Sequence, residues 1–148
     1  HPALVDRIYL YESNKPLFEH YGLQDEIKQL FQNRQPLKSG GSVVMDFTEA
    51  LTVMDVNTGK FTGTNNLEET ILQTNLEAAE VIARLLKLRD IGGIIIVDFI
   101  DMETNEHREK VLHRMKELAA LDRSRTYVVG WTGLGLLEMT RKKVRMNE

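Results

Sequence analysis

Two aspartates and one asparagine are the residues of this 148-residue chain whose types and spacing could do chemistry. Asp55 and Asn57 stand two residues apart in an apolar stretch, so strand alternation puts both side chains on one face. Asp98 follows the apolar run 94–97, at the carboxyl end of an expected strand, where ligands bind in many α/β sheets. If the two strands are neighbours, Asp55 and Asp98 can converge into an oxygen site suited to Mg²⁺.

The same pattern admits a purely structural interpretation. In it, Asp98 caps the following turn and Asp55 pairs with a lysine or arginine. Periodicity alone does not decide between the two. Asp101, and Asp46 and Glu49 in an expected hairpin, are more typical of solvated or capping carboxylates, and the predicted site does not include them.

Composition excludes several classes of function. With 42% hydrophobic and 28% charged residues and a net charge of -3, the chain has the make-up of an ordinary globular protein. It has no cysteine, which excludes disulfides, thiolate zinc sites and a cysteine nucleophile, and we expect a reducing, cytoplasmic compartment. The run 94–97 is far shorter than the ~20 apolar residues of a membrane span. The chain opens with His1 and no secretory signal, so we interpret it as a fragment of a longer protein.

Periodicity predicts a mixed α/β (α+β) fold, with a mixed sheet and two long helices packed on it. Predicted strands cover residues 8–11, 42–48, 51–57, 94–99, 126–129 and 136–140. Predicted helices cover residues 17–31, with a turn at Gly22 and a new start near Leu23, and residues 67–88 and 104–121. The hairpin joins 42–48 to 51–57, and an approximate capping box at Asn66 opens the second helix. Residues 94–99 have the pattern of an interior strand buried on both faces. Residues 33–41 are expected to be a linker, with a seam near residue 35.

Positive charge is concentrated near the end of the chain, at Arg141, Lys142, Lys143 and Arg145. Such a cluster can follow a polyanion backbone if it lies on the same side as Asp55 and Asp98. A solvated surface is the alternative.

Other catalytic motifs are missing from the sequence. It has no Gly-x-Ser-x-Gly elbow and no glycine-rich phosphate loop, and His107 and His113 stand six apart, which does not suit a shared metal. Residues 54–58 suggest a phosphatase of the haloacid dehalogenase type, but that family has a second aspartate where Asn57 stands. A non-catalytic RNA-binding or dimerisation module is a further alternative.

Seven segments, taken in order and spacing, resemble the bacterial ribonuclease E/G family: residues 39–46, 48–59, 66–70, 74–78, 88–93, 97–102 and 135–141. The resemblance covers essentially the whole chain. It implies that residues 1–34 are the C-terminal part of an RNase H-like subdomain and that residues 35–148 are a DNase I-like catalytic subdomain.

The resemblance also implies a chemistry. Asp55 and Asp98 match the family's ligands for the catalytic Mg²⁺, and Asn57 matches the residue that orients the first carboxylate. The expected reaction is endonucleolytic cleavage of single-stranded RNA, in RNA processing and decay, by metal-activated water attack that leaves a 5′-phosphate.

The resemblance bears on partners as well. We expect Arg141, Lys142 and Lys143 to contact RNA. The family's full-length proteins are expected to be homo-oligomers joined by a cysteine-containing zinc link, for which this chain has no cysteine. Since the S1 domain and the 5′-monophosphate sensor are also expected to lie outside the chain, we predict weak cleavage by the chain alone.

Overall fold

The computed structural model describes residues 1–59 and 66–144. The chain divides into two compact units, His1–Phe31 and Gln32–Glu148. The boundary therefore lies a few residues before the predicted seam near residue 35. The assignment of the two units to RNase H-like and DNase I-like subdomains stays a prediction.

The first unit consists of short helices: η1 (Pro2–Arg7), α1 (Leu17–His20) and α2 (Leu23–Leu30). Helix over most of residues 17–31 is confirmed, with a break at Gly22, whose φ of 69° is left-handed. The strand predicted over residues 8–11 is wrong: this segment is irregular, and Tyr9 and Leu10 are both 84% exposed. Alternation alone does not make a strand, because the backbone groups need a neighbouring strand to bond with.

The described part of the second unit contains a six-stranded sheet in the order β1-β2-β3-β4-β6-β5, so the predicted mixed sheet is confirmed. Its strands are β1 (Arg34–Pro36), β2 (Ser42–Phe47), β3 (Leu51–Asn57), β4 (Gly93–Asp98), β5 (Thr126–Trp131) and β6 (Leu137–Arg141). Within residues 1–59 and 66–144, only β3 and β4 pair in parallel, and the other neighbours are antiparallel. The expected hairpin is β2–β3. The predicted linker over residues 33–41 is wrong in part, because β1 lies within it.

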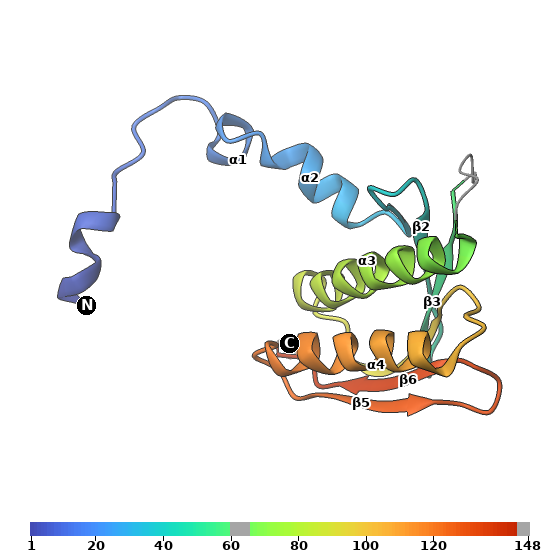
Figure 1. The fold of residues 1–148 in the computed structure, drawn as a ribbon. Helices are drawn as coiled ribbons and strands as arrows, with labels where there is room; N and C mark the ends of the chain where they lie inside the picture. The colour runs from blue at the N-terminus through green and yellow to red at the C-terminus, as the bar shows by residue number, and fades with distance from the viewer. Residues whose placement is uncertain (60–65, 145–148) are drawn as a thin grey trace. The chain divides into compact units, whose positions relative to one another are not determined.

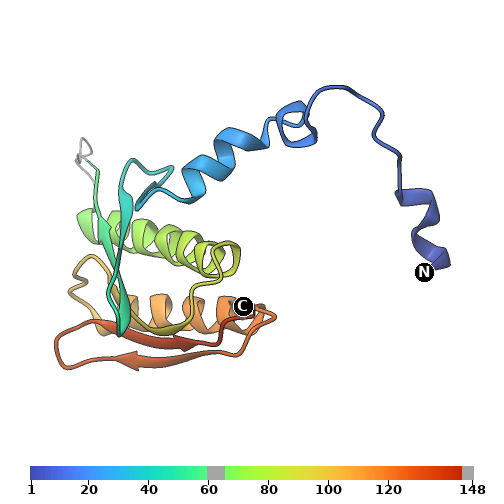
Figure 2. The ribbon, with the colours of Figure 1, turned by 180° about the vertical axis from the view of Figure 1, so that it is seen from behind.

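Two helices, α3 (Leu67–Leu88) and α4 (Asn105–Ala120), lie side by side on one face of this sheet (Figure 1). Seen from behind, the strands lie in front of both helices (Figure 2). The core fills the space between the layers. Its fully buried side chains include Met45, Met54, Ile82, Leu85 and Leu86.

Strand β4 shows the consequence of this one-sided cover. Its interior position is confirmed, since β3 and β6 flank it. Burial on both faces is wrong: Ile95 and Val97 are fully buried, whereas Ile94 is 49% exposed. The helices cover only one face of the second unit's sheet, as is common when most strands are antiparallel.

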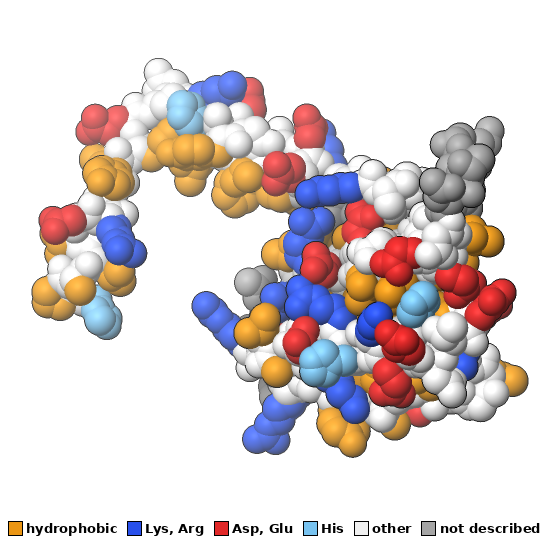
Figure 3. Space-filling view, in the orientation of Figure 1, with side chains coloured by type: hydrophobic (Ala, Val, Ile, Leu, Met, Phe, Trp, Pro, Cys, Tyr) orange, Lys and Arg blue, Asp and Glu red, His pale blue; other side chains and the backbone are white. Residues whose placement is uncertain are grey.

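The two long helices begin differently. The Thr104 side chain accepts a hydrogen bond from the His107 backbone N–H at 3.2 Å, which caps α4. Asn66 precedes α3 with a φ of 53° and makes no side-chain cap, so the predicted capping box is not formed. On the face covered by the two helices, acidic side chains gather toward the end where both helices begin (Figure 3). The first turn of α3 contains Glu68 and Glu69, and the first turn of α4 contains Glu106. Negative charge there complements the helix dipoles. No helix in the described part of the chain combines the length and apolar character needed to cross a membrane.

Candidate metal centre

The structure brings the two predicted aspartates together. Asp55 ends up opposite Asp98 in the parallel register of β3 and β4. Neighbouring strands lie about 4.8 Å apart, so the two Cβ atoms start from adjacent positions. Their chain neighbours Met54 and Val97 are fully buried beneath the helices. Alternation therefore directs both exposed aspartates to the opposite, helix-free face of the sheet.

Asn57 lies on the same face as Asp55, as its spacing predicts. Its Nδ2 donates a hydrogen bond to Oδ2 of Asp55 at 3.0 Å. This bond occupies one carboxylate oxygen from the side and restrains the rotamer of Asp55. The three residues therefore form one polar group at the carboxyl ends of β3 and β4.

The electrostatics of the pair favour a bound cation. Desolvation raises the pKa of Asp98 above its ordinary value, and the negative charges of Asp55 and Asp101 raise it further. Among residues 1–59 and 66–144, no lysine or arginine lies within ion-pair distance of Asp55 or Asp98. The alternative in which Asp55 pairs with a basic residue therefore has no partner within these ranges.

The donor set fits Mg²⁺ better than a softer metal. The described ranges contain no cluster of three or more His, Cys, Asp or Glu side chains arranged to hold a metal. Two carboxylates are nevertheless a common protein contribution to a Mg²⁺ site, because this ion keeps several waters and accepts substrate phosphate oxygens. The residues present are thus suited to hold Mg²⁺ at an open surface.

Sequence reasoning missed one basic residue near this group. Arg34 pairs with Val44, which in turn pairs with Asp55, so the arginine shares a cross-strand row with the carboxylates. Its Nη1 donates to Oγ of Ser42 at 2.7 Å, and Ser42 is the register partner of Asn57. Two strand spacings separate Arg34 from Asp55, about 10 Å. Because β1 was expected to be a linker, no sequence signal placed Arg34 on this row.

The basic cluster lies at the opposite end of the strands from the carboxylate pair. In the antiparallel β4–β6 pair, Arg141 is opposite Gly93, at the start of β4, whereas Asp98 ends that strand. Five residues of strand correspond to about 16 Å. Lys142 and Lys143 follow Arg141 and are exposed, and Arg145 lies outside the described residues. They therefore do not border the carboxylate pair, and any RNA contact they make is remote from it.

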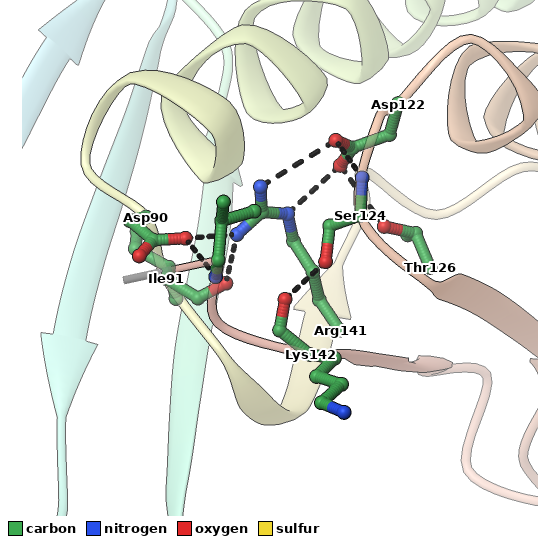
Figure 4. Close-up of polar contacts among 8 residues, drawn as sticks. Asp90, Ile91, Asp122, Ser124, Thr126, Arg141 and Lys142 are labelled. Atoms are coloured by element: carbon green, nitrogen blue, oxygen red, sulfur yellow. Dashed lines mark hydrogen bonds and ion pairs between the residues drawn. The ribbon is translucent and has the colours of Figure 1, made fainter. Parts of the chain in front are cut away.

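Arg141 itself does not fit the predicted RNA contact, because its side chain is buried in an ion-pair network (Figure 4). Only 2% of the side chain is exposed. Its guanidinium donates to Asp122 at 2.8 Å, to Asp90 at 2.9 Å and to the carbonyl of Ile91 at 3.1 Å. All the observed partners of the guanidinium are thus within the fold, and Arg141 is a structural cation.

Asp122 completes this network. Burial alone raises its pKa, but hydrogen bonds from Arg141, the Ser124 backbone N–H and the Thr126 hydroxyl outweigh burial, and the pKa lies below its ordinary value. The Ser124 hydroxyl also bonds the carbonyl of Lys142. The network therefore ties the end of β6 to the turn before β5.

Comparisons with known proteins show which family the chain belongs to. A sequence profile described as the Ribonuclease E/G family matches residues 1–144. Ribonuclease G of Haemophilus influenzae is 51% identical over 144 residues, which are 97% of this chain and 29% of that protein. Ribonuclease G of Escherichia coli K12 is 45% identical over the same shares. Ribonuclease E of Haemophilus influenzae is 44% identical over 97% of this chain and 15% of that protein.

The chain belongs to the Ribonuclease E/G family. It spans less than a third of the length of the relatives it matches. The family assignment leaves the haloacid dehalogenase interpretation without support.

Proposed function

We propose that the second unit carries the catalytic centre of an endoribonuclease that cleaves single-stranded RNA, with Asp55 and Asp98 holding Mg²⁺. The observation that carries the proposal is their register: they are direct partners on neighbouring parallel strands, on the helix-free face. The names of the relatives support a ribonuclease, and RNA processing or decay in the cytoplasm is the setting we propose for it.

Each of the three residues has a distinct role in this proposal. Asp55 and Asp98 bind the cation. Without a cation, the negative charge of Asp55 disfavours ionisation of Asp98, whereas a bound cation attracts both negative charges. Asn57 holds Asp55 in one rotamer through its 3.0 Å hydrogen bond. When bound, Mg²⁺ supplies positive charge for the phosphodiester and a lowered pKa for water. Because the pair faces away from the helix layer, an extended RNA strand can approach it across an open sheet face.

Basic residues contribute to substrate binding in this proposal. Arg34 lies in the same row as the carboxylates, about 10 Å away, and is placed to contact a phosphate next to the cleaved bond. Lys142 and Lys143 lie beyond the far end of β4, so we propose that they contact the RNA backbone several nucleotides away. Full-length relatives contain additional sequence, and we expect that part to supply most of the substrate positioning.

Divalent-ion binding to the 148-residue chain tests the proposal directly. Mn²⁺ is used in place of Mg²⁺, and the signal of unbound Mn²⁺ is measured by electron paramagnetic resonance. We expect Asp55→Asn and Asp98→Asn each to abolish saturable Mn²⁺ binding. Asp46→Asn, which removes an exposed carboxylate from the same sheet face, is the control and should bind normally. Equal binding by all three variants would refute the assignment.

RNA cleavage provides the second arm. With Mg²⁺ present, a labelled single-stranded oligoribonucleotide should be cut slowly to products with 5′-phosphate ends. Neither Asp55→Asn nor Asp98→Asn should cut it. Products with 5′-hydroxyl ends would contradict the proposed attack by water.

A further inference from the structure

The segment 74–78 of α3 is one of those that carry the family resemblance, yet none of its residues belongs to the carboxylate group. It lies on the helix layer, whereas Asp55 and Asp98 face the other side of the sheet. Two of its side chains, Asn75 and Glu77, reach backbone segments that are remote in sequence. Both of these segments adjoin the candidate metal centre.

Asn75 holds the loop that follows Asp98. Its side chain is completely buried. Oδ1 accepts from the backbone N–H of Ile100 at 3.0 Å, and Nδ2 donates to the carbonyl of the same residue at 2.9 Å. The side-chain amide thus pairs with Ile100 as a neighbouring strand would. Ile100 is two residues beyond Asp98, so this pairing fixes the course of the chain where β4 ends.

Glu77 holds the turn before β2. Its carboxylate accepts backbone hydrogen bonds from Lys38 and Ser39, the latter at 3.2 Å. This turn lies against the end of β3: a Cβ added at Gly41 would come within 2.3 Å of the carbonyl oxygen of Asn57. Fixing the turn therefore limits the movement of Asn57, whose side chain in turn restrains Asp55.

We propose that Asn75 and Glu77 are positioning residues, which fix the separation of Asp55 and Asp98 by holding the backbone beside the end of each strand. The proposal rests on the proposed function, since the separation matters only if a cation is shared. Neither side chain touches the cation in this proposal. Residues that support metal ligands from outside commonly change metal affinity by 10- to 100-fold when replaced.

The main variant is Asn75→Leu, which keeps the branched shape of the side chain and its number of heavy atoms and removes both bonds to Ile100. Thr74→Val is its matched control, because Thr74 is also buried on α3 and, within the described residues, its hydroxyl donates to the carbonyl of Thr70 in the same helix. We expect Asn75→Leu to weaken Mn²⁺ binding about tenfold and to speed amide hydrogen exchange at Ile100. Thr74→Val should leave both unchanged. A folded Asn75→Leu chain with unchanged Mn²⁺ affinity would overturn the role of Asn75.

Glu77→Ala keeps the proposal testable if Asn75→Leu does not fold, because Glu77 is partly exposed. Its control is Glu80→Ala, which removes the same charge from the exposed side of α3, where Glu80 pairs with Arg114 of α4 and not with the turn before β2. We expect Glu77→Ala to weaken Mn²⁺ binding more than Glu80→Ala does, and equal affinities would overturn the role of Glu77. Mn²⁺ binding by the wild type, and its expected loss in Asp98→Asn, are measured first. If the wild type does not bind Mn²⁺, the proposed function has failed. Amide hydrogen exchange at Ile100 reports the Asn75 contact independently of metal binding.

Discussion

Replacing Arg141 with methionine tests whether this residue is a structural cation or an RNA contact. The change keeps most of the side-chain volume but removes the charge and the bonds to Asp122, Asp90 and Ile91. Removing one partner of a buried ion pair costs about 3–5 kcal/mol. We expect the lower value, about 3 kcal/mol, because Asp122 keeps its bonds from Ser124 and Thr126.

Urea unfolding followed by far-ultraviolet circular dichroism measures this loss at neutral pH. A loss of about 3 kcal/mol lowers the melting temperature of a unit of this size by about 10 °C. The double variant Arg141→Met with Asp122→Asn should lose less than the sum of the two single variants, because the uncompensated charge is gone. The coupling is expected to be about 2 kcal/mol.

RNA binding supplies the contrasting measurement. Replacement of Lys142 and Lys143 by alanine should weaken RNA binding and flatten its salt dependence, with the stability unchanged. If Arg141→Met changed the free energy of unfolding by less than about 1 kcal/mol and weakened RNA binding as the lysine variants do, the structural role would be refuted.

Three further predictions concern stability. Without divalent ions, Asp98→Asn should raise the free energy of unfolding by up to about 1 kcal/mol, because it removes the repulsion from Asp55. In thermal melts, Mg²⁺ should stabilise the wild type and not the variant. A lower melting temperature for the variant than for the wild type without divalent ions would contradict this. Gly41→Ala should destabilise the chain and perturb the amide signals of Asn57, because the new Cβ would lie 2.3 Å from a carbonyl oxygen; unchanged spectra would count against the close contact. The pKa of Asp122 is lowered in the folded state, so its contribution to stability is complete above the unfolded pKa of about 3.9 and is lost as the pH falls through the folded pKa. In urea titrations from pH 6 to pH 2, the free energy of unfolding should therefore decline less steeply for Asp122→Asn than for the wild type.

Much of the second unit was predictable because its periodic segments are long. The hairpin, both long helices and the closing strands appear where hydrophobic spacing puts them. Strand β1 was not predictable in this way, because three residues are too few to show alternation and its identity depends on pairing with β2. The reverse error occurred at residues 8–11, which alternate but have no strand beside them.

Some residues of the candidate site could likewise be predicted from the sequence, and others could not. Asp98 could be selected because it ends an apolar run, and Asp55 because it shares a strand face with Asn57; both are local properties. The location of the basic cluster depends on strand order: with β6 antiparallel to β4, Arg141 lies at the edge opposite Asp98. Asn75 escaped notice because its partner is the backbone of Ile100, 25 residues away, and no side-chain pattern marks a bond to a distant backbone.

The parallel pairing of β3 with β4 decides when, during synthesis, the two acids can meet. A parallel pair cannot be closed by a tight turn, and here the connection includes the 22 residues of α3. The β2–β3 hairpin can form early, but it carries only one of the two acids. A nascent chain therefore completes the pair only after β4 has left the ribosome and docked. If the pair is the cleavage centre, a nascent chain whose β4 has not yet emerged cannot cut the messenger from which it is being translated.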